Sequence, residues 1–311
     1  MPLEQAVQSV ESLPRLPRRP REGHKGTFGT VLVVAGSRGM AGAAVLTGRA
    51  ALRGGAGLVR VACPADVWDV IATAYAAYTT WGIPLTSEGT YAADAAERVV
   101  AEVATDVDVV AIGPGLGRRP DTISFIRRLL ALLPQQRPLV VDADALFALS
   151  PYVDYPLTVH RAAVLTPHPG EFARLTGWPK PQSPEERRQQ VVEFTHRWPQ
   201  VVLLKGAGTL VCDGQRLYCN TTGNPGMATG GSGDVLTGII AAFIAQGLTP
   251  FDAAVLGAFV HGRAGDLAAA QLGQTALTAP DLLDYLPEAL KPFETSEEID
   301  RLTSSDPARM L

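Results

Sequence analysis

One pattern recurs along the chain: a short run of β-branched and aliphatic residues, a turn of small residues, and a stretch with helical spacing of apolar residues. The apolar runs are residues 30–35, 58–62, 107–112, 139–142, 163–166 and 201–204. Continuous apolar runs are typical of strands that are buried on both faces of a parallel sheet. Strands that alternate with helices over this length predict right-handed crossovers, and so an α/β fold with a mostly parallel sheet between two layers of helices.

The stretch 209–220 departs from that pattern, because it alternates about Asp213-Gly214. An Asp-Gly pair between two such runs is typical of a hairpin, so we predict an antiparallel pair at one end of the sheet. Further helices are expected over about 184–198, 250–272 and 279–286. The predicted organisation is an extended Pro/Arg-rich arm over 1–22, most simply a solvated lead-in, then a domain over 23–290 and a polar tail over 291–311.

Bulk composition excludes several classes of protein. With 311 residues and 46% hydrophobic content, the chain can bury the core of one large α/β domain. A net charge of −4 does not favour nucleic acid or an anionic membrane as the main partner. Three cysteines predict a reducing cytoplasm, and no apolar run approaches the roughly 20 residues that cross a bilayer.

The run Asn224-Pro-Gly-Met-Ala-Thr-Gly-Gly-Ser-Gly-Asp234 leads directly into a helical pattern. A glycine-rich turn that opens a helix presents free N–H groups and the positive end of the helix dipole, which together bind phosphate or another anion. An aspartate at such a place has a chemical reason: Asp234 takes a proton from a hydroxyl that then attacks a phosphoryl group. The alternative is that Asp234 is only the N-cap of the helix.

Other small or polar motifs also follow predicted strands. Gly113-Pro-Gly-Leu-Gly117 either lets a ligand approach the backbone or is a plain turn. Asp142 and Asp144 end a strand, where a carboxylate either holds a metal or caps the next helix. Because ligands of such sheets bind at the carboxyl ends of the strands, we expect these motifs to form one cleft.

Two further motifs belong to the same set. His168 stands between two prolines, which fix its backbone, so it either contacts substrate or has a structural role. Glu171 follows in the first turn of the next helix, where we expect it to organise Mg²⁺ through water. Lys205-Gly-Ala-Gly-Thr209 exposes backbone donors for nucleotide phosphates or ribose, or is a tight turn between strands. His261 lies in a helical pattern with no evident place in a cleft, so we expect a structural role.

Taken in order, these motifs resemble one family. They are Lys25-Gly-Thr-Phe-Gly-Thr30, Ala35-Gly-Ser-Arg-Gly-Met-Ala-Gly-Ala-Ala44, Ile112-Gly-Pro-Gly-Leu-Gly117, Val141-Asp-Ala-Asp-Ala-Leu146, Leu165-Thr-Pro-His-Pro-Gly-Glu171, Leu204-Lys-Gly-Ala-Gly-Thr209 and Asn224 to Asp234. Over roughly residues 23–287 the chain is similar to the ADP/ATP-dependent NAD(P)H-hydrate dehydratases of the ribokinase-like superfamily. The resemblance implies a ribokinase-like three-layer sandwich and a repair reaction, in which a nucleotide drives removal of water from the (6S) hydrate of NADH or NADPH. ADP, which gives AMP and phosphate, is the donor of bacterial and archaeal members, and ATP that of eukaryotic members.

The resemblance also implies site residues. Asp234 is the catalytic base, and the anion hole is formed by the backbone of Gly231, Ser232 and Gly233. The nucleotide is bound by Lys205, Gly206, Ala207, Gly208, Thr209 and Gly233. The hydrate is bound by Ala43, Gly115, Gly117, His168 and Asp234. Mg²⁺ is expected on the phosphates, with Glu171 as its protein contact through water.

Partners and alternatives complete the prediction. Too few residues precede Gly23 for the epimerase domain that many relatives carry, so we expect a separate NAD(P)H-hydrate epimerase in the pathway. A cytoplasmic homo-oligomer, a tetramer by resemblance, is expected, with no nucleic acid and no membrane as partner. The alternatives are a ribokinase-like kinase of a small vitamin precursor and a nucleotide-binding regulator without catalysis.

Overall fold

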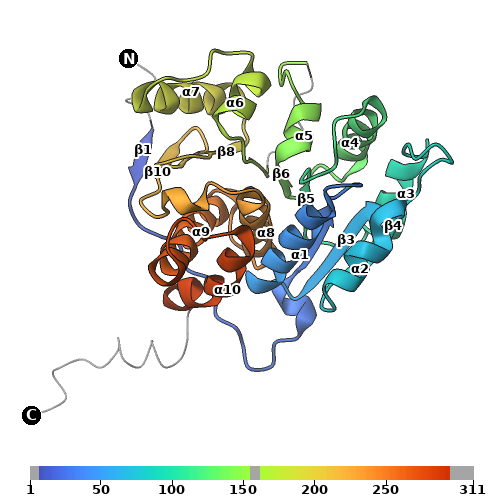
Figure 1. Ribbon diagram of the computed structural model, residues 1–311. Coiled ribbons are helices and arrows are strands. Elements are labelled where there is room, and N and C mark those ends of the chain that lie inside the picture. Colours follow the sequence, from blue (N-terminus) through green and yellow to red (C-terminus); the bar gives the residue numbers. More distant parts are fainter. Residues whose placement is uncertain (1–6, 155–161, 295–311) are drawn as a thin grey trace, which may run out of the picture.

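The strands of residues 7–154 and 162–294, which this computed structural model describes, form one ten-stranded sheet (Figure 1). Its order from edge to edge is β1-β10-β9-β8-β7-β6-β5-β2-β3-β4. The strands are β1 (Gln8–Val10), β2 (Thr30–Val34), β3 (Leu58–Pro64), β4 (Thr79–Ile83), β5 (Val109–Ile112), β6 (Leu139–Val141), β7 (Ala163–Leu165), β8 (Val201–Leu204), β9 (Leu210–Cys212) and β10 (Arg216–Cys219).

Strand direction follows the prediction. All pairs from β8 to β4 are parallel, whereas β8–β9 and β9–β10 are antiparallel. The predicted hairpin about Asp213-Gly214 is therefore confirmed, and it lies toward one end of the sheet. Strand β4 was not predicted, because its sequence, Thr-Thr-Trp-Gly-Ile, mixes polar residues and a glycine and its side chains are partly exposed at the sheet edge.

Helices cover both faces of the sheet, as Figure 1 shows. One face packs against α1 (Ala41–Arg53), α2 (Trp68–Ala74), α8 (Ser232–Ala245), α9 (Pro250–Leu272) and α10 (Ala279–Leu290). The other packs against α3 (Ala95–Glu102), α4 (Pro120–Leu132), α5 (Ala143–Ala148), α6 (Pro169–Thr176) and α7 (Pro184–Arg197).

Strand β2 shows why the apolar runs are continuous. Val31 and Val33 belong to the core beneath one helical layer, and Leu32 and Val34 to the core beneath the other. Successive side chains of a strand point to opposite faces, so a strand covered on both sides needs apolar residues at every position. The three-layer α/β prediction is confirmed.

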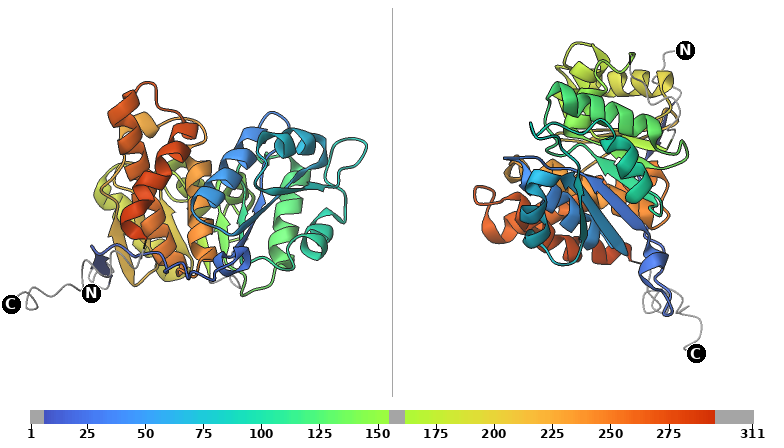
Figure 2. Two further views of the ribbon diagram at one scale, coloured as in Figure 1. Left: turned by 90° about the horizontal axis from the view of Figure 1, so that it is seen from below. Right: turned by 90° about the vertical axis from the view of Figure 1, so that its right-hand side faces the viewer.

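We predicted that the N-terminal arm is solvated, but parts of it pack against the domain. Residues Gln8–Val10 pair with β10 in parallel, and Leu16 is buried with its N–H bonded to the Phe293 carbonyl. The Arg19 guanidinium donates to the Gly55 carbonyl and to Gln246 Oε1, and it lies 4.0 Å above the Phe28 ring. Figure 2 (left) shows the arm passing beneath the helices from the sheet edge toward β2. Leu16 and Arg19 therefore attach this segment to the rest of the domain.

The structure describes only part of the predicted N-terminal arm and C-terminal tail. Residues Lys291–Phe293 form one 3₁₀ turn, and residues 295–311 of the predicted polar tail, like residues 1–6 of the arm, lie outside the described residues. Within the two described ranges, the helices are too short or too polar to cross a membrane.

Candidate active site

The polar motifs meet at one edge of the sheet. Strands β2, β5, β6, β7 and β8 run parallel, so their carboxyl ends share that edge. Asp142 follows β6, His168 follows β7 and Lys205 follows β8. The amino end of α8 reaches the same place, since its Thr237 contacts Asp142. The motifs therefore gather at one edge of the sheet, as predicted, but they do not all line one cleft: the cleft beside Lys205 is lined by the 205–209 motif and the start of α8, and not by residues 113–117, Asp142 or His168.

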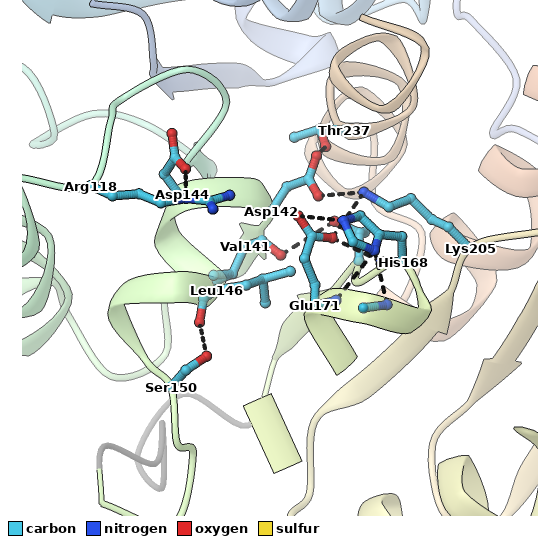
Figure 3. A network of polar contacts seen from close by, with 12 residues as sticks. Arg118, Val141, Asp142, Asp144, Leu146, Ser150, His168, Glu171, Lys205 and Thr237 are labelled. Carbon is cyan, nitrogen blue, oxygen red and sulfur yellow. Dashed lines mark hydrogen bonds and ion pairs between the residues drawn. The ribbon is translucent and has the colours of Figure 1, made fainter. Parts of the chain in front are cut away.

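A buried ion pair lies at the centre of this edge (Figure 3). Lys205 Nζ is 2.8 Å from Asp142 Oδ1, and the Thr237 hydroxyl donates to Asp142 Oδ2 over 2.8 Å. Asp142 is 1% exposed. Burial alone lowers the pKa of the Lys205 ammonium, but the charges of Asp142 and Glu171 outweigh it and raise that pKa, so Lys205 stays charged. Asp142 occupies the N-cap position of α5, yet its carboxylate makes no capping bond there.

Helix α8 begins at the glycine-rich turn. Gly231 is its N-cap, with φ of +93° in the left-handed region that favours glycine. The alternative that Asp234 only caps the helix is therefore wrong, because Asp234 is the third helical residue. A Cβ built on Gly233 would lie 3.4 Å from Lys205 Nζ and 3.8 Å from Asp142 Oδ2. The positive end of the helix and the ammonium thus face the same small space.

The carboxyl of Asp234 has an unusual proton affinity. Its pKa is raised to about 7, first by burial and then by the negative charge of Asp142, with a smaller contribution from Asp144, while Lys205 opposes the rise. A carboxyl that titrates near neutral pH is suited to accept a proton during catalysis. The predicted base therefore lies in surroundings that fit the role.

His168 and Glu171 make a capping box at the start of α6. His168 Nδ1 accepts hydrogen bonds from Gly170 N and Glu171 N, and Glu171 Oε2 accepts from His168 N over 2.8 Å. Glu171 Oε2 is also 3.7 Å from Lys205 Nζ. Because Nδ1 accepts these hydrogen bonds, the neutral ring carries its proton on Nε2. Burial lowers the pKa of His168 and so favours the neutral ring. His168 Nε2 lies 3.5 Å from Glu171 Oε1, and the His168 side chain is 56% exposed.

A cleft of about 540 Å³ opens beside the ion pair. Every residue predicted to bind the nucleotide lines it: Lys205, Gly206, Ala207, Gly208, Thr209 and Gly233. Residues that sequence analysis did not select also line it, among them Asn220, Thr222, Asn224, Met227, Leu236 and His261. Such a volume is ordinary for a small-molecule site.

His261 has a place that the sequence prediction missed. It lines the cleft, and its Nε2 lies 2.9 Å from the carbonyl oxygen of Ser232 in the first turn of α8. A carbonyl only accepts, so Nε2 donates; burial lowers the His261 pKa to about 4 and keeps the ring neutral. The sequence did not reveal this contact, because helical spacing does not show which face of α9 meets the first turn of α8.

Of the predicted hydrate-binding residues, Ala43 lies in the first turn of α1, and Gly115 and Gly117 lie in the loop after β5, which touches it. His168 and Asp234 lie apart from these, at the starts of α6 and α8. A Cβ built on Gly115 would lie 2.8 Å from Ala43 Cβ, and Ser37 Oγ donates to the Gly115 carbonyl. Gly117 N donates to Asp144 Oδ2, and the Arg118 guanidinium binds the other oxygen of Asp144. The loop after β5 and the start of α1 therefore lie on the side of β2 and β5, away from the loop after β8, and Asp144 is close enough to raise the pKa of Asp234.

The described residues do not fit a resident metal ion. No group of three His, Cys, Asp or Glu side chains within residues 7–154 and 162–294 is arranged to hold one. The carboxylates of Asp142 and Glu171 are already bonded within the protein. A Mg²⁺ ion that arrives on nucleotide phosphates keeps most of its waters and needs only outer contacts from the protein.

Fold and site together define a nucleotide-binding protein of the ribokinase-like class. A ribokinase-like superfamily protein from Enterococcus faecalis aligns with a TM-score of 0.79 and 27% identity, over 94% of this chain and 98% of that one. A hydroxyethylthiazole kinase from Pyrococcus horikoshii, with a TM-score of 0.58 and 17% identity, shares the fold.

The chain belongs to the NAD(P)H-hydrate dehydratase family, whose model matches residues 31–288. It is 29% identical to the ADP/ATP-dependent NAD(P)H-hydrate dehydratase from Bacillus subtilis that was co-crystallized with ATP/Mg²⁺, with a TM-score of 0.75 over 92% of this chain and 100% of that one. It is 48% identical to the bifunctional NAD(P)H-hydrate repair enzyme of Moorella thermoacetica over 88% of this chain. The chain spans about half the length of the curated relatives it matches, 51% of that enzyme. The family resemblance is confirmed.

Proposed function

We propose that this chain removes water from the (6S) hydrates of NADH and NADPH, with ADP rather than ATP as the phosphoryl donor. The observation that supports it most directly is Asp234, a carboxyl with pKa raised to about 7, placed at the amino end of a helix that faces a lysine ammonium. Family membership supplies the substrate class, since the relatives' names give NAD(P)H hydrate.

In the proposed reaction the hydrate hydroxyl attacks the terminal phosphorus of the nucleotide. Asp234 takes the hydroxyl proton, and the bond from phosphorus to the leaving AMP oxygen breaks. The N–H groups of Gly231 to Gly233 stabilise the charge on the transferring group. Phosphate then leaves with the electrons of its C–O bond, the neighbouring ring carbon loses a proton to solvent, and the double bond re-forms, giving NAD(P)H, AMP and phosphate.

Residues on either side of Asp234 have separate tasks in this proposal. Lys205 to Thr209 and Gly233 bind the AMP part in the cleft, and Ala43, Gly115, Gly117 and His168 bind the hydrate. Mg²⁺ travels on the phosphates, with Glu171 in contact through water. A separate epimerase, a homotetramer and a cytoplasmic location stay predictions.

The test is the absorbance band of reduced nicotinamide after purified protein is mixed with Mg²⁺ and NADH hydrate, with ADP and ATP in parallel. A nucleotide-dependent rise is expected, faster with ADP. A flat trace from folded protein that still binds nucleotide contradicts the proposal, and a stable phosphorylated product in its place identifies a small-molecule kinase. A faster rise with ATP retains the dehydratase and corrects the donor.

A further inference from the structure

Three side chains from distant parts of the sequence form a continuous buried chain: Thr237 of α8, Asp142 after β6 and Lys205 after β8 (Figure 3). Thr237 is 0% exposed and Asp142 is 1% exposed. Only Lys205 reaches the cleft, where its side chain is 20% exposed. The two buried members therefore act on any ligand through the third.

The hydroxyl of Thr237 is used differently from those of other helical threonines here. Thr47, Thr176 and Thr195 each donate to the carbonyl four residues earlier. That local bond is the usual choice of a threonine inside a helix. Thr237 donates instead to Asp142 Oδ2, far away in the sequence, within a helix whose later residues are otherwise apolar. Helix α8 is thereby bonded to the end of β6 next to the anion site.

A buried carboxylate is not needed for stability at such a place. Apolar side chains of similar size usually stabilise a core at least as well as a buried ion pair does. The charge of Asp142 does have an evident target, because its other oxygen binds the Lys205 ammonium. Two fixed hydrogen bonds hold the carboxylate, and the carboxylate in turn fixes where that ammonium lies.

The ammonium has bonding capacity left on the cleft side. An ammonium has three N–H donors, and Asp142 accepts from one of them. Glu171 lies 3.7 Å away, and Gly233 of α8 stands against the ammonium on the cleft side. Three carboxylates, those of Asp142, Glu171 and Asp234, act on this cation. An incoming phosphate therefore needs the ammonium to lie between it and the carboxylates of Asp142 and Glu171.

We propose that Thr237 and Asp142 are positioning residues, which hold the Lys205 ammonium beside the first turn of α8 so that both contact the same phosphate of the bound nucleotide. This inference rests on the proposed function for the identity of the nucleotide. It assigns the ammonium to the phosphate, while the backbone of Lys205 to Thr209 serves the rest of the nucleotide.

The test compares Thr237→Val, which keeps the shape and removes the hydroxyl, with Thr237→Ser, which keeps the hydroxyl. Binding of ADP and of adenosine is measured by calorimetry without any hydrate, so the result does not depend on dehydratase activity. We expect Val to weaken ADP binding about tenfold and to leave adenosine binding within twofold, with Ser close to the original protein. Thr47→Val is the matched control, because Thr47 is also 0% exposed but donates to the Ala43 carbonyl of its own helix.

A double-mutant cycle separates positioning from general damage. If Thr237 acts through Lys205, Thr237→Val costs little further ADP affinity once Lys205→Met is present. Asp142→Asn, which keeps the size of the side chain, is the second variant should Thr237→Val fold poorly, and the same selective loss of ADP affinity is expected. Equal loss of ADP and adenosine affinity, additive effects in the cycle, or unchanged ADP affinity overturns the inference.

Discussion

The two sides of Asp234 are built differently. On the side of β8, the loop Lys205–Thr209 and the segment after β10 surround an open cleft of about 540 Å³. On the side of β2 and β5, the loop after β5 packs closely on the first turn of α1, so that a Cβ on Gly115 would lie 2.8 Å from Ala43 Cβ. The first side presents backbone groups around a preformed space, whereas the second depends on the fit between that loop and the helix. Substitutions should therefore affect the two substrates separately.

The largest effect is expected where the two sides meet. Asp234→Asn removes the proton acceptor, so turnover should fall about a thousandfold or more, while the affinity for ADP stays within about threefold. Single-turnover rates and calorimetry on the same preparation measure both. A variant that turns over near the original rate shows that Asp234 is not the base.

The hydrate side is tested by Gly115→Ala. Gly115 has φ of +62°, and the added Cβ would also lie 2.9 Å from the Met40 carbonyl, so the loop must shift. The KM for the hydrate should rise about tenfold to a hundredfold, with ADP affinity unchanged. Gly89→Ala is the control, since Gly89 has φ of +72° but nothing within 4 Å of the added Cβ. Equal effects on both substrates would remove the distinction between the two sides.

The nucleotide side is tested by Gly233→Ala. The backbone there suits alanine, and the added Cβ would make ordinary contact with the Lys205 ammonium, 3.4 Å away. The methyl group occupies space meant for phosphate, so ADP affinity should fall about tenfold, while the melting temperature stays equal or rises slightly. A raised KM for the hydrate with normal ADP binding contradicts the assignment.

The pH dependence follows from the raised pKa of Asp234. Turnover needs the ionised carboxyl, so kcat should fall as the pH decreases through about 7, and the rate profile of single turnovers measures this. A pH-independent rate between 5 and 8 contradicts the proposed base.

The raised pKa of Asp234 also affects the stability of the fold, and this is the smallest effect that we expect. The folded-state pKa exceeds the unfolded-state value, so the protonated carboxyl favours folding, and this contribution is lost as pH rises toward 7. Asp234→Asn should therefore be more stable than the original protein by about 1–2 kcal/mol at pH 8, with the advantage shrinking toward pH 4. Denaturant unfolding at both pH values measures the difference.

Sequence patterns predicted the helices and strands better than they predicted contacts between side chains. The strands buried on both faces were found because each requires an unbroken apolar run, as in Thr30–Val34. The edge strands Gln8–Val10 and Thr79–Ile83 were missed because an edge imposes no such run. Glycine-rich motifs located the anion turn for the same local reason.

The side-chain contacts that hold the site together could not be predicted from one sequence. Asp142 bonds Lys205 and Thr237, which follow it by 63 and 95 residues, and no local pattern marks those pairings. His261 was assigned a structural role because helical spacing alone does not show that α9 faces the first turn of α8. Motifs thus predict which backbone meets a ligand, and the fold decides which side chains hold that backbone in place.

The edge strand of the arm has a consequence for the order of folding. Gln8 pairs with Arg216, and β1 has its register only against β10. A ribosome that makes this chain releases the arm long before β10 exists, so the arm finds its place only after most of the sheet is available. The part of the described chain that is synthesised first is therefore among the last to be fixed.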